Sequence, residues 1–198
     1  VTMVSGANKG VDLMTYNGAI LNPNFDPAGK DGYVIITPSG RMRIANKWDL
    51  RLSDLTGMAG DRSVQLKPME NASDFARMMC VIREQKLTIL TSLLFEKQGL
   101  TDQYTKDTTG DDSRRYILQF ADGSFGMIDS EEDMSINDLL SLSYRLGAIK
   151  AVYCDTGMYD RAAYYTYPDG EKQQTVIGWA DAENSSNRII FYSQPSPE

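Results

Sequence analysis

The 198-residue sequence contains no histidine. This absence excludes Ser–His and Cys–His nucleophile pairs, and it removes the commonest catalytic proton shuttle and metal ligand. Any acid–base chemistry would therefore fall to Asp, Glu, Lys, Tyr or Cys side chains.

Cysteine is almost as scarce, since only Cys80 and Cys154 are present, both within apolar stretches. Two thiols are too few for a thiolate zinc site, and they could be buried free thiols or one disulfide. Cysteine usage therefore leaves the compartment open. No spacing of residues demands a cofactor, and a divalent ion at Asp155 would be compatible with the sequence without being required by it.

Long apolar runs and an excess of positive charge are also missing. No stretch reaches 18 consecutive apolar residues, so we expect no transmembrane segment. The formal net charge is −7, whereas binding to nucleic acid or anionic lipid requires a basic surface. We therefore expect neither as a partner. The chain opens on Val1-Thr2 without an initiator Met or a leader pattern, which predicts trimming from a longer precursor.

The apolar patterns predict one α+β domain over residues 1–198, with a mixed twisted sheet, two main helices packed on it and long loops forming one rim. Residues 33–36 and 41–45 predict a hairpin, and a two-residue Asp122-Gly123 turn predicts another over residues 116–128. Residues 87–95 and 148–153 predict buried strands, the second of them central in the sheet. Residues 50–61 show no clear period and are expected to be irregular.

Both helices are indicated by a capping residue followed by an apolar stripe. One begins near Ser73 or Asp74, with Cys80 expected as core filler beside its stripe. The other is capped by Ser135 and ends at Gly147, after the acidic residues 129–133, which we interpret as a solvated loop. The two stripes are Phe75, Met78, Met79 and Ile82, and Ile136, Leu139, Leu140 and Ser143.

Chemistry is suggested by the two arginines that lead the strand at residue 116 and by Asp155-Thr156-Gly157, which follows the later buried strand. If these strand ends meet at one end of the sheet, a guanidinium and a carboxylate would face a small anionic or sugar-like ligand. The simpler interpretations are a surface ion pair for Arg115 and an Asx turn at Asp155.

The order of these motifs resembles the phosphodiester glycosidase family. The resemblance rests on Arg115-Tyr116-Ile117-Leu118, the Asp122-Gly123 turn, Leu146-Gly147-Ala148 and Tyr153-Cys154-Asp155-Thr156-Gly157. Residues 16–21 are similar to the family's Asn-Gly-Gly segment, and residues 186–190 to its C-terminal arginine-bearing strand. The chain departs from the family at Ala19, where a second glycine is usual, and after Gly157, where the family has a glycine-rich loop.

The resemblance implies a hydrolase that cleaves a sugar phosphodiester or a related glycoside outside the cytoplasm, whether secreted, periplasmic or at the cell surface. Arg115 and Arg188 would bind the anion, and Asn17 with the backbone of Gly18 would position sugar hydroxyls. Asp155 would act as acid/base, nucleophile or stabiliser of an oxocarbenium-like centre. The adjoining loop residues Thr156 and Gly157 would contact the small carbohydrate or sugar-phosphate ligand.

Two other functions remain open. A non-catalytic module of the same fold could bind a glycan or a protein, which the departures at Ala19 and Met158 favour. Asp155-Thr156-Gly157 also matches the signature tripeptide of aspartic proteases, but it occurs once and would require a homodimer. On sequence alone, Asn17-Gly18 is typical of a turn and Arg188 of an exposed edge-strand charge.

Overall fold

The computed structural model describes residues 2–5, 13–23, 31–96, 114–130, 132–154, 161–166, 171, 173–178 and 188–191. Within these residues the fold is α+β, as predicted. No helix in this part of the chain is long and apolar enough to cross a bilayer.

The helices are α1 (Leu52–Thr56), a 3-10 helix (Ala59–Ser63), α2 (Ala72–Glu84) and α3 (Ile136–Arg145). The strands are β1 (Thr2–Ser5), β2 (Met14–Tyr16), β3 (Ala19–Asn22), β4 (Gly32–Ile36), β5 (Met42–Asn46), β6 (Thr88–Ser92), β7 (Leu94–Glu96), β8 (Arg115–Phe120), β9 (Phe125–Asp129), β10 (Ala148–Cys154), β11 (Arg161–Thr166), β12 (Gln173–Gly178) and β13 (Arg188–Phe191).

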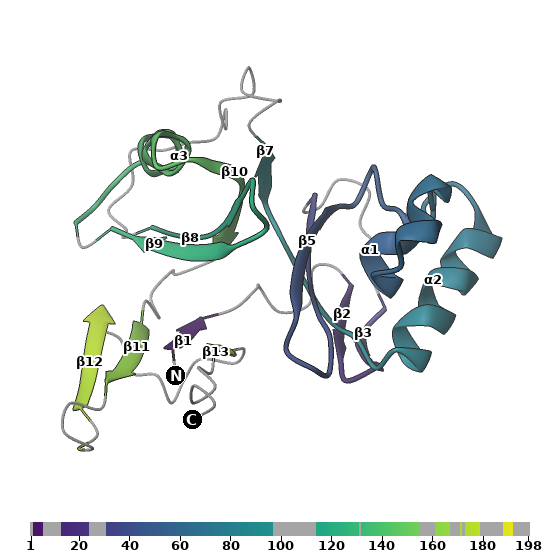
Figure 1. Ribbon diagram of the computed structural model, residues 1–198, viewed down its shortest axis with the longest axis horizontal. Coiled ribbons are helices and arrows are strands. Elements are labelled where there is room, and N and C mark those ends of the chain that lie inside the picture. The colour runs from purple at the N-terminus through teal and green to yellow at the C-terminus, as the bar shows by residue number, and fades with distance from the viewer. Residues whose placement is uncertain are drawn as a thin grey trace.

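The described strands form three sheets (Figure 1), with the orders β3-β2-β6-β4-β5, β7-β10-β8-β9 and β12-β11-β1-β13. Every strand pair among them is antiparallel, so the prediction of a single mixed sheet was wrong. In two of the sheets the reason is the connectivity: after the hairpins β4–β5 and β8–β9, a helix returns the chain beside the first hairpin strand, where the new strand runs antiparallel. The predicted interior position of β10 is confirmed, because it lies between β7 and β8.

Both main helices face the core as predicted, and α3 starts as predicted, whereas α2 is capped two residues before the predicted Ser73. The side chain of Asn71 caps α2, and the Ser135 hydroxyl caps α3 by accepting from the Asp138 N–H at 3.0 Å. The buried positions of the two helices are Met78, Met79 and Ile82, and Ile136, Leu139, Leu140, Ser143 and Tyr144.

The cysteines are both free thiols. Cys80 is exposed, so its prediction as core filler was wrong: it follows Met79 by about 100° around the helix, which turns it away from the buried stripe. The Cys80 thiol donates a hydrogen bond of 3.2 Å to Glu84 Oε1, and this bond raises the pKa of the thiol. Cys154 is buried at the end of β10.

Residues 50–61 are not irregular throughout, because they contain α1 and the start of the 3-10 helix. The Arg51 N–H donates to the Asp54 carboxylate at 2.8 Å, which caps α1. Gly57, with φ of 73°, ends it after five residues. A helix of that length is too short to establish a visible apolar period, which explains why the pattern was missed.

Two segments of the chain share one connectivity. In the first unit, β2, β4, β5, α2 and β6 form the sheet order β2-β6-β4-β5; in the second unit, β7, β8, β9, α3 and β10 form β7-β10-β8-β9. Each unit thus consists of a first strand, a hairpin, a helix and a last strand inserted between the first strand and the hairpin; β7 lies at the edge of its sheet, whereas β2 also pairs with β3. β6 leads directly into β7 through Leu93, so the units are consecutive in the chain.

The two hairpins correspond residue by residue. Residues 32–46 align with residues 115–129 without a gap, because Gly32 pairs with Asn46 as Arg115 pairs with Asp129. In the first hairpin the N–H of Gly40 donates to the Thr37 carbonyl at 2.9 Å, and in the second the N–H of Gly123 donates to the Phe120 carbonyl at 3.0 Å. Both loops therefore contain three residues with a left-handed glycine last, which corrects the predicted two-residue turn at Asp122-Gly123.

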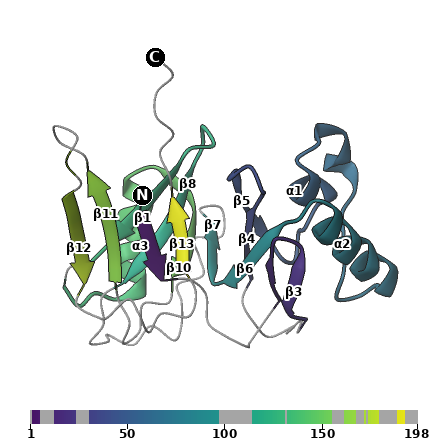
Figure 2. The same ribbon diagram turned by 90° about the horizontal axis from the view of Figure 1, so that it is seen from below.

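The units pack through corresponding faces. One apolar cluster joins the two sheets, and its buried members are Val34, Ile44 and Leu90 from the first unit and Ile117, Val152 and Cys154 from the second. Val34 aligns with Ile117, and Leu90 aligns with Val152. A helix covers the outer face of each sheet, α2 in the first unit and α3 in the second. The two helices accordingly lie on opposite sides of the two packed sheets, as Figure 1 shows; Figure 2 gives the view turned by 90°.

Equivalent substitutions at Gly40 and Gly123 should cost equal stability. Both glycines have positive φ, and a Cβ at either would meet nothing within 4 Å, so Gly40→Ala and Gly123→Ala should each destabilise by about 1–2 kcal/mol through backbone conformation alone. Gly60→Ala is the matched control, because Gly60 is equally open but lacks a positive φ, and it should be neutral or slightly stabilising. Urea unfolding measures all three. A cost at only one hairpin would contradict their equivalence.

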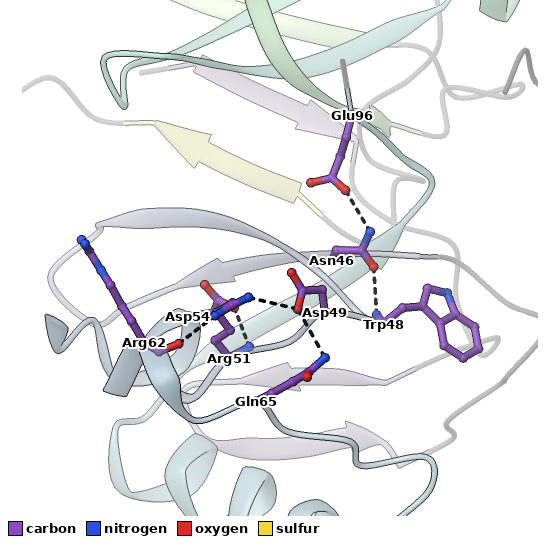
Figure 3. Close-up of polar contacts among 8 residues, drawn as sticks. All are labelled: Asn46, Trp48, Asp49, Arg51, Asp54, Arg62, Gln65 and Glu96. Atoms are coloured by element: carbon purple, nitrogen blue, oxygen red, sulfur yellow. Dashed lines mark hydrogen bonds and ion pairs between the residues drawn. The ribbon is translucent and has the colours of Figure 1, made fainter. Parts of the chain in front are cut away.

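A polar seam of Asn46, Glu96 and Lys150 links the two sheets. Glu96 accepts from Asn46 Nδ2 at 3.0 Å, as Figure 3 shows, and forms an ion pair with Lys150 at 3.0 Å. Burial favours a raised pKa for Glu96, but the hydrogen bonds from Asn46 and Lys150 outweigh it and lower that pKa.

Tyr144 on α3 should give the protein an alkaline instability. Burial, assisted by the negative charge of Glu96, raises the pKa of Tyr144 from 10.0 to about 12. The folded state thus holds the phenol proton more tightly than the unfolded chain, so its contribution is complete below pH 10.0 and is lost as the pH rises towards 12. Urea unfolding across this pH range should show that the free energy of unfolding falls more steeply with pH for the parent than for Tyr144→Phe. Parallel curves would contradict the assignment.

Candidate functional site

Arg115 opens β8 as a completely buried cation. It lies between two neighbouring strands, opposite Asp129 of β9 and Cys154 of β10. Its Nε donates to Asp129 Oδ2 at 3.1 Å, and its Nη2 donates to the same oxygen. The Arg115 side chain is 0% exposed and that of Asp129 is 9% exposed, so this is a buried ion pair. Asp129 therefore does not belong to a solvated loop, as the acidic run had suggested; it ends β9, where the arginine draws it inward.

Arg114 is a second buried cation next to the first. Its Nε donates to the Met134 carbonyl at 3.2 Å, and its Nη1 donates to the Tyr153 hydroxyl at 3.2 Å. Its backbone N–H donates to Ser130 Oγ at 2.7 Å. We call Arg114, Arg115, Asp129, Ser130 and Tyr153 the arginine cluster. The sequence signal for it was the pair of adjacent arginines, whose side chains leave an extended chain on opposite sides and so find different partners.

The charges of this cluster are unusual for a protein interior. Each buried ion costs several kcal/mol of hydration, which an ion pair recovers only with good geometry and further hydrogen bonds. Clusters of buried ionisable groups accordingly mark candidates for functional sites, because chemistry needs charges in fixed positions away from water. Two guanidinium groups and one carboxylate give the arginine cluster a positive formal sum. Chemically, such an arrangement can attract and orient an anion.

The remaining predicted site residues after β10 lie beyond what the structure describes. β10 ends at Cys154, directly opposite Arg115, and Asp155 is the next residue in the chain. Asp155, Thr156 and Gly157 are outside the described residues, so their roles stay predictions. Arg188 begins β13 and pairs with Ser5 of β1, but its side chain is likewise not described.

Asn17 and Gly18 form the turn between β2 and β3. The Gly18 N–H donates to the Leu87 carbonyl and the Asn17 N–H to Thr88 Oγ1, both at 3.0 Å. Gly18 has φ of 80°, and a Cβ there would lie 3.0 Å from the Arg83 carbonyl oxygen. Backbone conformation and close packing therefore explain why glycine occupies this position.

This turn is not close to the arginine cluster in the fold. It is bonded to the first residue of β6, Thr88, whereas Ser92 at the last residue of β6 donates to the carbonyl oxygen of Tyr153. Four residue steps along the strand separate these two points, a distance of about 13 Å. The structure therefore brings together Arg114, Arg115 and the end of β10, and it places Asn17 and Gly18 elsewhere.

No metal site is apparent in the described part of the chain, where no three acidic or cysteine side chains gather closely enough to hold an ion. Asp155 is not among those residues, so the divalent ion considered there remains untested. Neither models of known protein families nor curated proteins gave a match to this chain. The proposal below accordingly rests on the residues and their geometry.

Proposed function

We propose that the protein is a glycosidase-type hydrolase that cleaves a sugar phosphodiester or a related glycoside at the end of β10. The observation that carries this proposal is the pair of buried guanidinium groups, Arg114 and Arg115, fixed at the strand end from which the chain continues into Asp155. Hydrolysis of an anionic glycoside is assisted by a fixed positive region that binds the anion and by a carboxylate for the chemical step, the role proposed for Asp155.

The proposed roles of the two arginines follow from their burial and contacts. Arg115 is fully enclosed and bound to Asp129, so its charge would act on the ligand through the field of the site and through positioning of β10. Arg114, held by Tyr153 and the Met134 carbonyl, would supply the second cation. Asp155 would be the acid/base or nucleophile. Because a phosphate leaving group needs less protonation than an alkoxide, one carboxylate would be sufficient.

A second candidate is a non-catalytic module that binds a glycan or a protein. The observation favouring it is the complete burial of Arg115, because a guanidinium with no exposed surface cannot grip a ligand from solution directly. In that case the arginine cluster would be a structural support for a binding rim.

The two candidates are separated by turnover. The purified protein is incubated with N-acetylglucosamine 1-phosphodiester and with the corresponding uncharged aryl glycoside, and release of sugar is followed by chromatography. Turnover of the phosphodiester with inhibition by inorganic phosphate supports the hydrolase. Saturable binding of either compound without turnover supports the module. Neither turnover nor binding would overturn both proposals.

A further inference from the structure

The first unit has a counterpart of the arginine cluster at its own strand ends. Asp31 aligns with Arg114, and Lys47 aligns with Ser130. The same backbone hydrogen bond ends both hairpins: the N–H of Lys47 donates to the Asp31 carbonyl at 2.7 Å, and the N–H of Ser130 donates to the Arg114 carbonyl at 2.9 Å. At this place the first unit presents Trp48, half of whose side chain is exposed. The duplicated architecture thus provides a second position where loops after corresponding strands could hold a ligand.

The indole of Trp48 is held in one orientation by its neighbours. Its Nε1 donates to Asp31 Oδ1 at 2.7 Å, and its backbone N–H donates to Asn46 Oδ1 at 2.8 Å. Asn46 is in turn fixed by Glu96, at 3.0 Å, and Figure 3 shows the ring directed away from this chain of contacts. The ammonium of Lys47, which is 2% exposed, lies 5.6 Å from the ring centroid. A ring fixed before binding loses little conformational entropy when a ligand covers it.

The charges around the ring select the class of ligand. The Lys47 ammonium beside the ring opposes a cationic ligand, which would otherwise be the usual partner of an indole face. The carboxylate of Asp31, which accepts the indole N–H, opposes an anion. What remains is a neutral ligand with one apolar face and hydroxyl donors for that carboxylate. A pyranose ring meets this description, because its C–H groups form an apolar face and its hydroxyls surround the edge.

We propose that Trp48, with Asp31, Asn46 and Lys47, is a binding platform for a neutral sugar ring. This platform is separate from the arginine cluster: the Asn46–Glu96 contact lies at the Lys150 end of β10, and Arg115 lies opposite Cys154 at the other end. Four residue steps along the strand, about 13 Å, separate Lys150 from Cys154. The platform does not depend on the hydrolase proposal, since it would serve a hydrolase or a binding module equally.

Intrinsic fluorescence provides the test, because Trp48 and Trp179 are the two tryptophans of the chain. In the Trp179→Phe background, emission from Trp48 is followed during titration with N-acetylchitotriose, which is neutral, and with its deacetylated form, which is cationic but has the same backbone. The neutral trisaccharide should give a saturable change in emission, and the cationic form should bind more weakly. Maltotriose serves as a second neutral probe. The absence of a saturable response to both neutral probes would overturn the proposal.

Calorimetry with three variants of the full chain separates the platform from general surface binding. Trp48→Ala should weaken binding of the neutral trisaccharide by about tenfold or more. Asp31→Asn retains an oxygen acceptor for the indole N–H and should weaken it less. Tyr16→Ala is the matched control, because Tyr16 is an exposed aromatic residue on β2, and it should bind as the parent does. Equal affinity of Trp48→Ala and the parent, or an equal loss in Tyr16→Ala, would contradict the assignment.

Discussion

Replacing Asp129 with alanine should destabilise the protein by about 3–5 kcal/mol, because the change removes the carboxylate that accepts two bonds from a fully buried guanidinium. The Arg115 side chain has no exposed surface and cannot recover its hydration without opening the sheet between β8 and β10. The cost is therefore much larger than that of breaking an exposed ion pair. Urea unfolding followed by circular dichroism measures it.

Two further variants make this result specific. Asp133→Ala removes an exposed carboxylate and should change stability by no more than about 0.5 kcal/mol. The double variant Arg115→Met with Asp129→Leu replaces both charges by apolar side chains and should recover most of the stability lost in Asp129→Ala. A loss below about 1 kcal/mol in Asp129→Ala would show that the pair is not buried in solution as the structure has it.

Replacing Asp155 with asparagine should reduce kcat/KM for the phosphodiester by about 100-fold or more, because the amide can neither accept a proton nor attack the sugar. The loss should appear in kcat with little change in KM, since the guanidinium groups that attract the anion are untouched. Steady-state kinetics on the N-acetylglucosamine 1-phosphodiester measure both constants.

A matched exposed position controls for surface charge. Glu70→Gln removes an exposed carboxylate that pairs with Lys67 at 3.1 Å, and this variant should retain the parent rate. Thermal unfolding of Asp155→Asn must show a folded protein for the comparison to count. A folded Asp155→Asn variant that turns over at the parent rate would remove Asp155 from the chemistry.

The features that the sequence predicted are those determined by neighbouring residues. The Ser135 cap, the buried stripe Leu139–Leu140 and the left-handed Gly147 each depend on contacts within a few positions, and all three are present. The hairpins over residues 32–46 and 115–129 were likewise predicted, apart from the loop length at Asp122-Gly123. Local propensity and turn chemistry act over such short distances.

The features that could not be predicted depend on contacts between distant segments. Nothing near Arg115 in the chain indicates that β9 and β10 enclose it, and Asp129 reads as one member of an acidic run until its strand is paired. The same is true of Trp48, whose partner Asp31 approaches it only in the folded chain, and of Asn46, whose partner Glu96 does so too. The repeated unit could not be predicted from the sequence either, because aligned positions such as Gly32 and Arg115 have the same place in the strand pairing but different side chains.

The divergence between the units explains where chemistry could arise. In the first unit, a Cβ at Gly32 would lie 2.7 Å from Leu94 Cβ, because the chain passes there from β6 into β7. That crossing leaves no room for a large side chain. The matching position of the second unit holds Arg115, so the second unit has a buried charge at a position where the first unit has no room for one.

The most direct test of the arginine cluster is a ¹H–¹⁵N spectrum of the arginine Nε–H groups during titration with inorganic phosphate and with N-acetylglucosamine 1-phosphate. Because burial and hydrogen bonding slow proton exchange, the Arg114 and Arg115 signals should be visible and can be assigned with Arg114→Lys and Arg115→Lys. We predict that both signals shift in a saturable manner with the sugar phosphate. Saturable shifts confined to other arginines, or no shifts with either compound, would contradict a functional site at the end of β10.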